Sequence, residues 1–170
     1  LLVGGGGHRT GKRGGAWREL REFARRYYPG ATEKYQWATQ DCMSLDGIPY
    51  IGRYSKTTPN LYVASGFNKW GMTSSMAAAE ILADLVVGKS SEYEPLFNPS
   101  RNILKPQLFV NGFEAVTNLL TPTLKRCPHL GCALKWNKAE HTWDCPCHGS
   151  RFEKNGDLID NPATGGVDIG

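Results

Sequence analysis

The sequence reads Cys127-Pro-His129-Leu-Gly-Cys132 and then Cys145-Pro-Cys147-His148-Gly-Ser150 near its C-terminal end. These two stretches hold four of the five cysteines and two of the four histidines. The first offers a Cys-x-His pair and the second a Cys-x-x-His pair, which together provide two thiolates and two imidazoles. One further cysteine remains in each stretch. Thiolates and neutral imidazoles suit iron and zinc, so the pattern predicts a metal centre.

The two stretches resemble the cluster-binding loops of Rieske proteins. A Rieske [2Fe–2S] centre has two cysteines on one iron and two histidines on the other. The resemblance implies that Cys127 and Cys145 hold the inner iron, and that His129 and His148 hold the outer, more exposed iron. Because neutral imidazoles replace two anionic thiolates, such a centre has a higher potential than an all-cysteine cluster.

The remaining residues of the two stretches also match the family. The resemblance implies a disulfide between Cys132 and Cys147 that joins the loops. Ser150 stands where a family serine donates a hydrogen bond to a cluster sulfur and raises the potential. Phe152 stands where respiratory members carry a tyrosine, and it has no hydroxyl. We therefore expect a potential below the respiratory range.

Zinc is the alternative metal, because short Cys/His spacings also build tetrahedral zinc sites. A zinc site would not require Pro146, Gly149 and Ser150 around the second pair, nor an additional cysteine in each stretch. We therefore favour iron.

Composition places the chain among ordinary globular proteins. It has 170 residues, of which 40% are hydrophobic and 21% charged, with a net charge of +4. No apolar run approaches the roughly 20 residues that cross a bilayer, so we expect no membrane span. We expect no nucleic-acid partner either, because no aromatic-interleaved basic motif is present. Basic residues crowd the N-terminal end, where we interpret them as a solvated helix face: Arg9, Lys12, Arg13, Arg18, Arg21, Arg25 and Arg26.

The N-terminal end suggests a piece of a longer protein, since the chain begins with Leu1 and not with an initiator Met. We expect a soluble, cytoplasmic protein of bacterial type, because cysteines clustered for metal fit a reducing compartment. Isolated Cys42 is interpreted as a small buried hydrophobe. The glycines that follow Val3 nearly match two nucleotide-binding motifs. G-x-G-x-x-G fails in every register, and the phosphate-loop spacing fails at Arg13, which replaces a hydroxyl residue.

Hydrophobic periodicity and turn residues predict the elements of the chain. Helices are expected at 16–28, 72–87 and 107–120, and strands at 1–3, 35–41, 50–52 and 61–64. A hairpin is expected between the two cysteine-containing stretches, from 133–136 and 141–143. Asn155-Gly156 predicts a second hairpin turn, and residues 161–163 resemble the proline loop that covers a Rieske cluster.

A second resemblance lies in residues 36–88. Asp-Gly-x-Pro-x-Ile-Gly, a strand, and Gly-Phe-x-x-x-Gly-x-Thr before an Ala-rich helix resemble the C-terminal end of FAD-dependent amine oxidoreductases, such as D-amino acid oxidase, glycine oxidase and sarcosine oxidase. In that family the loop lies against the flavin ring, and the helix start stabilises negative charge near N1 and O2. The resemblance implies these FAD contacts: Gly66, Lys69, Trp70, Gly71, Met72 and Thr73.

The resemblance identifies the substrate side less sharply. The family's dinucleotide fingerprint is absent, so these residues alone do not account for binding of the ADP half of FAD. Gln40, Asp41 and Arg53 lie near the ends of the family's substrate strands, and they are the candidate catalytic residues. Each could equally be a surface or structural residue.

Together the resemblances predict an α+β fragment of an FAD-linked oxidoreductase followed by a small, mainly β Rieske-type domain. The expected extents are 1–100 for the FAD-linked part, 101–122 for a helical linker and 123–170 for the Rieske domain. Only four residues separate Pro122 from Cys127, so the Rieske domain looks trimmed of its first strands.

The expected enzyme oxidises a C–N bond of an amine or amino acid at FAD. It then passes electrons singly to the [2Fe–2S] cluster, and from there to a protein or quinone acceptor. The alternative is a non-catalytic module, holding zinc or a redox-sensing iron–sulfur centre, attached to a flavin-binding remnant.

Overall fold

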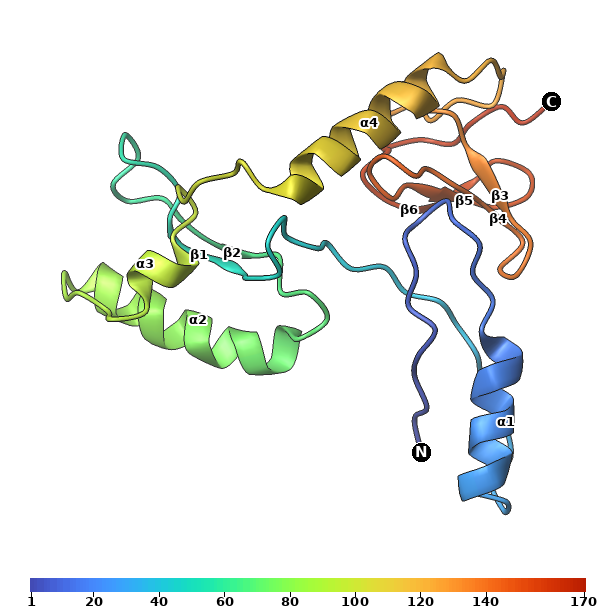
Figure 1. Cartoon of the computed structure of the whole chain (residues 1–170), viewed down its shortest axis with the longest axis horizontal. Helices are drawn as coiled ribbons and strands as arrows, with labels where there is room; N and C mark the ends of the chain where they lie inside the picture. The colour runs from blue at the N-terminus through green and yellow to red at the C-terminus, as the bar shows by residue number, and fades with distance from the viewer. The chain divides into compact units, whose positions relative to one another are not determined.

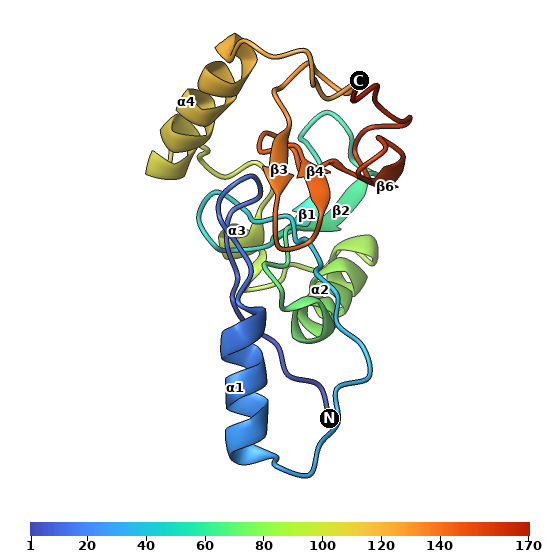
Figure 2. The same cartoon turned by 90° about the vertical axis from the view of Figure 1, so that its right-hand side faces the viewer.

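The computed structural model describes residues 1–170, which form two compact units (Figures 1 and 2). One unit consists of Leu1–Gln40 together with Asn111–Gly170, and the other is Asp41–Val110. The elements in chain order are α1 (Trp17–Tyr27), β1 (Tyr50–Arg53), β2 (Tyr62–Ser65), α2 (Gly71–Val86), α3 (Glu94–Phe97), α4 (Pro106–Leu120), β3 (Lys135–Asn137), β4 (Thr142–Asp144), β5 (Arg151–Phe152) and β6 (Leu158–Asp160).

The unit Asp41–Val110 is built on an antiparallel pair, β1 and β2, in which Tyr50 pairs with Ser65 and Arg53 with Tyr62. Helix α2 packs on this pair through one apolar face. The core is small and consists of Ile51, Ala78, Ile81 and Leu85, with Tyr62, Phe67, Leu82 and Phe97 at its edge. The expected strands and helix are therefore present, with bounds that differ by no more than one residue.

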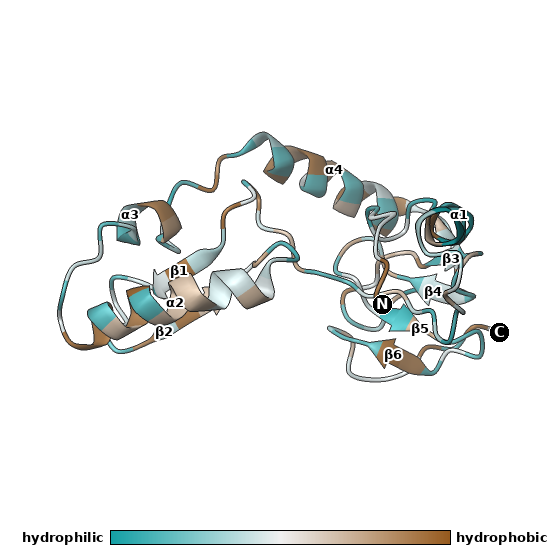
Figure 3. Cartoon of the chain, turned by 90° about the horizontal axis from the view of Figure 1, so that it is seen from below, coloured by the Kyte–Doolittle hydropathy of each residue, from teal (hydrophilic) through white to brown (hydrophobic).

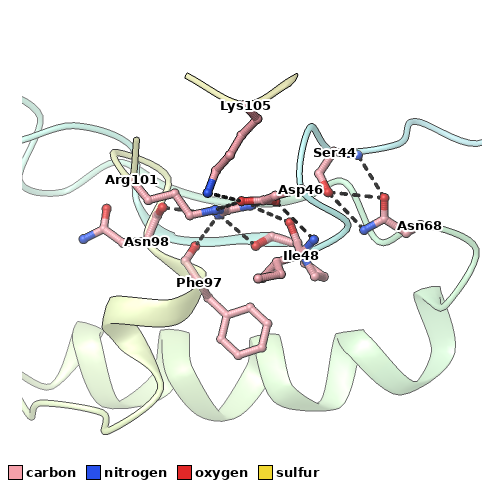
Figure 4. Close-up of polar contacts among 9 residues, drawn as sticks. Ser44, Asp46, Ile48, Asn68, Phe97, Asn98, Arg101 and Lys105 are labelled. Atoms are coloured by element: carbon pink, nitrogen blue, oxygen red, sulfur yellow. Dashed lines mark hydrogen bonds and ion pairs between the residues drawn. The ribbon is translucent and has the colours of Figure 1, made fainter. Parts of the chain in front are cut away.

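A nearly buried ion pair links the beginning of this unit to its end (Figure 4). The Arg101 guanidinium donates two hydrogen bonds to Asp46, with both N···O distances 2.8 Å. It also donates to the backbone carbonyls of Ile48, Pro49, Phe97 and Asn98. Its carbon Cζ lies 3.9 Å from the centre of the Tyr50 ring. Arg101 thereby joins the segment after α3 to the turn that precedes β1.

The second unit contains an antiparallel sheet with the order β3-β4-β5-β6. Strands β3 and β4 form the expected hairpin, with Trp136 opposite Trp143. Phe152 of β5 is fully buried beneath the two cysteine-containing loops, and Leu134 and Ala163 pack around it. Gly156 lies in the turn between β5 and β6, with a φ of 96° that favours glycine.

A buried polar network crosses β4 and β5. The Asp144 carboxylate accepts hydrogen bonds from Thr142 (2.8 Å), Arg151 (3.2 Å) and Asn137 (2.9 Å). The side chains of Asp144 and Arg151 are 5% and 9% exposed. Because buried charges are costly unless paired and hydrogen-bonded, this network fixes the two strands that bracket the second cysteine-containing loop.

Three sequence predictions are wrong. Residues 1–3 form no strand, and Leu1 and Leu2 are exposed. Residues 35–41 alternate in polarity but also form no strand, since no neighbouring strand pairs with their backbone. Cys42 lies in the same irregular region and is exposed, not buried.

Helices α1 and α4 differ in the hydropathy of their surfaces. Helix α1 buries none of its residues, and Figure 3 shows it mostly in the colours of hydrophilic residues. Helix α4 shows alternating hydrophobic and hydrophilic bands (Figure 3). None of the helices combines the length and apolar character that a membrane crossing demands.

Candidate metal and flavin sites

The two cysteine-containing loops close on themselves by the same backbone pattern. In the first, Cys127 N–H donates to Cys132 C=O (2.8 Å), and Gly131 N–H donates to Cys127 C=O (2.9 Å). In the second, Cys145 N–H donates to the carbonyl of Ser150 (2.8 Å), and Gly149 N–H returns to that of Cys145 (2.9 Å). Each loop thus forms one turn with a glycine at positive φ, 76° in the first and 91° in the second.

These loops bring the first cysteine of each together in the interior. Cys127 and Cys145 are free thiols, 2% and 0% exposed, and each lies within hydrogen-bonding reach of the other. Burial raises the pKa of the Cys145 thiol, backbone N–H groups of His148 and Cys147 oppose that shift, and neighbouring Cys127 adds to it. Two adjacent buried thiols ionise together only when a cation lies beside them, so the pair suits a metal.

The two histidines lie on the exposed side of the same loops. The ring centres of His129 and His148 are 4.9 Å apart and the rings are nearly perpendicular. The pKa of His148 is lowered, first by partial burial and then by the neighbouring His129. A lowered pKa favours the neutral imidazole, which is the form that binds metal.

The remaining two cysteines form a disulfide between the loops. The Sγ atoms of Cys132 and Cys147 are 2.26 Å apart. Together with Cys145 they make a group of three sulfurs within 4.8 Å. Sulfurs already bonded to each other are not available as thiolate ligands, so this grouping is not a three-cysteine zinc site. The donor set that remains is two thiols and two imidazoles.

Ser150 joins the second loop to the segment 161–163. Its side chain is fully buried, and its Oγ accepts a hydrogen bond from Ala163 N–H at 2.9 Å. The hydroxyl hydrogen is therefore left to donate elsewhere. Phe152 packs against Cys127 and Cys145, so residue 152 adjoins the two buried thiols as the sequence resemblance implies.

The predicted flavin contacts lie on one loop and one helix start in the unit Asp41–Val110. Between β2 and α2, Asn68 and Lys69 both have positive φ, 49° and 73°, a conformation uncommon for residues other than glycine. The Asn68 Oδ1 accepts a hydrogen bond from Ser44 N–H (2.9 Å) and another from the Ser44 hydroxyl (3.3 Å) (Figure 4). The Asn68 Nδ2 lies 3.2 Å from the same hydroxyl and is placed to donate to it. These contacts hold the loop in its strained form.

Helix α2 begins beside that loop without a side-chain cap. Trp70 and Met72 are 68% and 88% exposed there, although both are large apolar side chains. Gly71 and Thr73 are also exposed. Free N–H groups, a positive dipole end and an apolar surface suit a planar ring with an anionic edge. The helix start therefore fits the flavin ring of FAD, and Gly66 and Lys69 lie on the same loop.

The three candidate catalytic residues are not gathered into one site within either unit. Gln40 lies beside the second cysteine-containing loop, where its Oε1 would be 3.1 Å from a Cβ placed on Gly149. Asp41 is exposed in an irregular segment. Arg53 lines a surface hollow of about 320 Å³ together with Ser55, Lys56, Pro59, Glu94, Asn98 and Ser100.

Sequence patterns did not predict two contacts that lie near these sites. One is made by Asn68, whose side chain supports the loop between β2 and α2, called here the flavin-side loop after the predicted flavin contacts that it carries. The other is at the turn of Gly11, where a Cβ would lie 2.5 Å from Pro146. Both contacts join residues far apart in the sequence. The only local signal in the sequence is the residue type, since glycine and asparagine adopt positive φ more readily than other residues.

Comparison with protein families agrees with the two cofactors that the sequence predicts. Residues 1–85 match the family model of FAD dependent oxidoreductases. Residues 86–169 match that of the Rieske [2Fe-2S] domain. The first domain implies FAD and the second implies a [2Fe–2S] cluster, as predicted from the sequence.

Several named relatives are iron–sulfur proteins. The chain is 37% identical to YhfW of Bacillus subtilis (strain 168), whose name marks it as a provisional Rieske 2Fe-2S iron-sulfur protein, over 96% of the chain and 41% of the relative. It is 41% identical to the cytochrome b6-f complex iron-sulfur subunit of Prochlorococcus marinus (strain MIT 9211), over 33% of the chain and 30% of that subunit. The chloroplastic subunit of Fritillaria agrestis is 51% identical, over 22% of the chain and 16% of the subunit.

The chain spans well under half the length of YhfW. The alignment with YhfW runs over 209 positions, whereas the chain has 170 residues. YhfW therefore carries residues inside the aligned region that have no counterpart in this chain. The chain belongs to the FAD dependent oxidoreductase family through residues 1–85 and continues into a Rieske [2Fe-2S] domain over residues 86–169.

Proposed function

We propose that the chain is part of an oxidoreductase that takes electrons from a C–N bond of an amine or amino acid at FAD and passes them singly to a Rieske cluster. One observation carries this proposal. Two loops with the same backbone closure place two buried thiols and two facing imidazoles in one compact unit. That donor set matches a [2Fe–2S] centre of the Rieske type.

The proposed ligands divide by burial. Cys127 and Cys145 would hold the inner iron, since their sulfurs are enclosed by Phe152 and Leu134. His129 and His148 would hold the outer iron, since both rings are exposed. The exposed imidazoles would then face the electron donor or acceptor. The disulfide fixes the spacing of the loops, and Ser150 would donate its free hydroxyl hydrogen to a cluster sulfur.

On the flavin side, the residues of this chain would bind one edge of the ring. The N–H groups at the start of α2 and the Lys69 ammonium would stabilise negative charge on the pyrimidine edge. Exposed Trp70 and Met72 would cover the ring and exclude water. FAD, when bound, supplies the two-electron oxidation of substrate. Arg53, at the end of β1, is the proposed cation for a substrate carboxylate, with Gln40 and Asp41 as further candidates.

The bounds of the proposed modules differ from those of the family matches and from those of the compact units. The FAD-linked part would take residues 1–100, the linker 101–122 and the Rieske domain 123–170. The electron acceptor would be a protein or a quinone. It would bind at the histidine side of the loops, because electron transfer is fastest where the cluster ligands reach the surface.

The first experiment measures iron, acid-labile sulfide and the visible spectrum of the full-length protein containing this chain. We expect iron and sulfide in equal amounts, together with flavin absorption. Zinc without sulfide would overturn the Rieske assignment and favour the non-catalytic metal module.

The second experiment tests the coupling. The flavin is reduced anaerobically with candidate amines or amino acids, and the cluster is followed by electron paramagnetic resonance. We expect the signal of the reduced cluster to appear with flavin bleaching. A cluster that stays oxidised while the flavin bleaches would refute electron transfer between the two centres.

A further inference from the structure

The glycine-rich segment at residues 9–15 matches no nucleotide-binding motif, yet it has a definite structure. Lys12 N–H donates to the Arg9 carbonyl at 3.0 Å and closes a turn. Gly11 within the turn has a φ of 77°, and Gly15 has a φ of 97°. The turn, in blue in Figure 1, reaches the part of the same unit that carries the β3–β6 sheet.

The turn lies directly on the second cysteine-containing loop. A Cβ added to Gly11 would lie 2.5 Å from Pro146 Cβ and 3.2 Å from its Cα. Real Cβ contacts are essentially never this short, so only glycine permits the approach. Pro146, which stands between Cys145 and Cys147, is buried. The turn therefore covers the loop from outside.

Contacts on both sides of Gly11 hold the segment in place. Lys12 Nζ lies 2.7 Å from Glu114 Oε1 of α4. A Cβ on Gly15 would lie 2.8 Å from Ala139 Cβ, in the turn between β3 and β4. Gln40 lies against Gly149 and donates a long hydrogen bond, 3.5 Å, to Thr10. The contacts thus reach both ends of the second loop.

We propose that residues 9–15, with Gln40, form a cover over the second cluster loop that restricts access of water and chelators to the cluster. The cover comes from the part of the chain that matches the FAD dependent oxidoreductase family, whereas the loop belongs to the Rieske domain. The FAD-type part therefore completes the cluster site. This inference rests on the proposed function, because it requires a cluster in the loops.

The test compares Gly11→Ala with Gly88→Ala in the full-length holoprotein. Gly88 is a matched control, because its φ of 76° nearly equals the 77° of Gly11 and nothing lies within 4 Å of its added Cβ. Both variants suffer the same backbone strain, but only Gly11→Ala pushes the turn away from Pro146. The readouts are the rate of iron release to an excess of EDTA, and the cluster potential from a titration followed by electron paramagnetic resonance.

We expect Gly11→Ala to release iron about tenfold faster and to raise the potential, because water stabilises the more negative reduced cluster. Gly88→Ala should match the unaltered protein. Should Gly11→Ala fold poorly, Gly15→Ala serves in its place, since its Cβ meets only Ala139.

The outcomes separate the two proposals. Equal iron release from the unaltered protein and from both variants would overturn the cover and leave the cluster assignment intact. Equal acceleration in Gly11→Ala and Gly88→Ala would also overturn it, since strain alone would be the cause. An unaltered protein without iron and sulfide would refute the proposed function itself.

Discussion

Replacing Asp46 by Asn tests whether one ion pair holds together the unit that carries the flavin-side loop. The substitution keeps the size of the side chain and removes its charge, so the Arg101 guanidinium loses its counter-charge. Both side chains are only 12% exposed. Arg101 would keep its hydrogen bonds to four backbone carbonyls, which makes Asp46→Asn a test of the charge in particular.

The lowered pKa of Asp46 gives the magnitude of the ion pair's contribution to stability. The hydrogen bonds from Arg101 lower this pKa from 3.8 to about 2, against the opposing effect of burial. Each pKa unit corresponds to about 1.4 kcal/mol, so the charged form contributes about 2.5 kcal/mol to the stability of the unit. Because the pKa is depressed in the folded state, this contribution is complete above pH 4 or so. It disappears as the pH falls from about 4 towards 2.

The measurement is hydrogen exchange followed by mass spectrometry on peptides that cover residues 46–53 and 94–105 of the full-length protein. A loss of about 2.5 kcal/mol should accelerate amide exchange in both peptides by about 60-fold at neutral pH. The unaltered protein should lose protection in the same peptides when the pH is lowered below about 4, after correction for the intrinsic exchange rate.

Lys105→Gln is the matched control. Lys105 Nζ lies 3.9 Å from Asp46 and its side chain is 39% exposed, so its removal should accelerate exchange by less than about fivefold. If Asp46→Asn exchanges no faster than Lys105→Gln, the ion pair does not stabilise this unit and the reasoning is wrong.

Three further predictions concern the two sites. Ser150→Ala should lower the cluster potential and Phe152→Tyr should raise it, each by roughly 40 mV, the one-electron equivalent of a hydrogen bond worth about 1 kcal/mol; potentials that do not move would exclude hydrogen bonds to the cluster. Asp144→Ala should cost about 3–5 kcal/mol, because it leaves the buried Arg151 guanidinium without its counter-charge. The thermal midpoint of the holoprotein would fall and its iron content with it, whereas exposed Asp160→Ala should leave both unchanged. Gly71→Val should reduce flavin content at the start of α2, while Gly30→Val, with open space around it, should not; equal flavin content in both variants would remove the helix start from the FAD site.

Local patterns in the sequence predicted much of the fold. Helix α2 and the hairpin of β3 and β4 were expected from periodicity and turn residues, because their hydrogen bonds lie within one short segment. The two cysteine-containing loops could be recognised for the same reason, since each closes on itself. The family matches confirm both resemblances.

Contacts between distant segments were beyond sequence reasoning. Arg101 pairs with Asp46 although β1, β2, α2 and α3 separate the two residues in the sequence, and no sequence pattern near either residue indicates the pairing. The alternation of residues 35–41 was misleading because a strand also requires a partner edge, which no pattern within the segment can supply. The glycines that follow Val3 nearly match nucleotide-binding motifs, whereas the structural role of Gly11 depends on Pro146, far along the chain.

The repeated backbone closure of the two cysteine-containing loops has a consequence for protein engineering. Since each turn is held by its own main-chain hydrogen bonds, the identity of the side chains at 129 and 148 is not needed to shape it. Replacing both histidines by cysteines should therefore convert the centre to an all-thiolate type on an unchanged frame. The same scaffold would then offer its redox partners centres of different reduction potential.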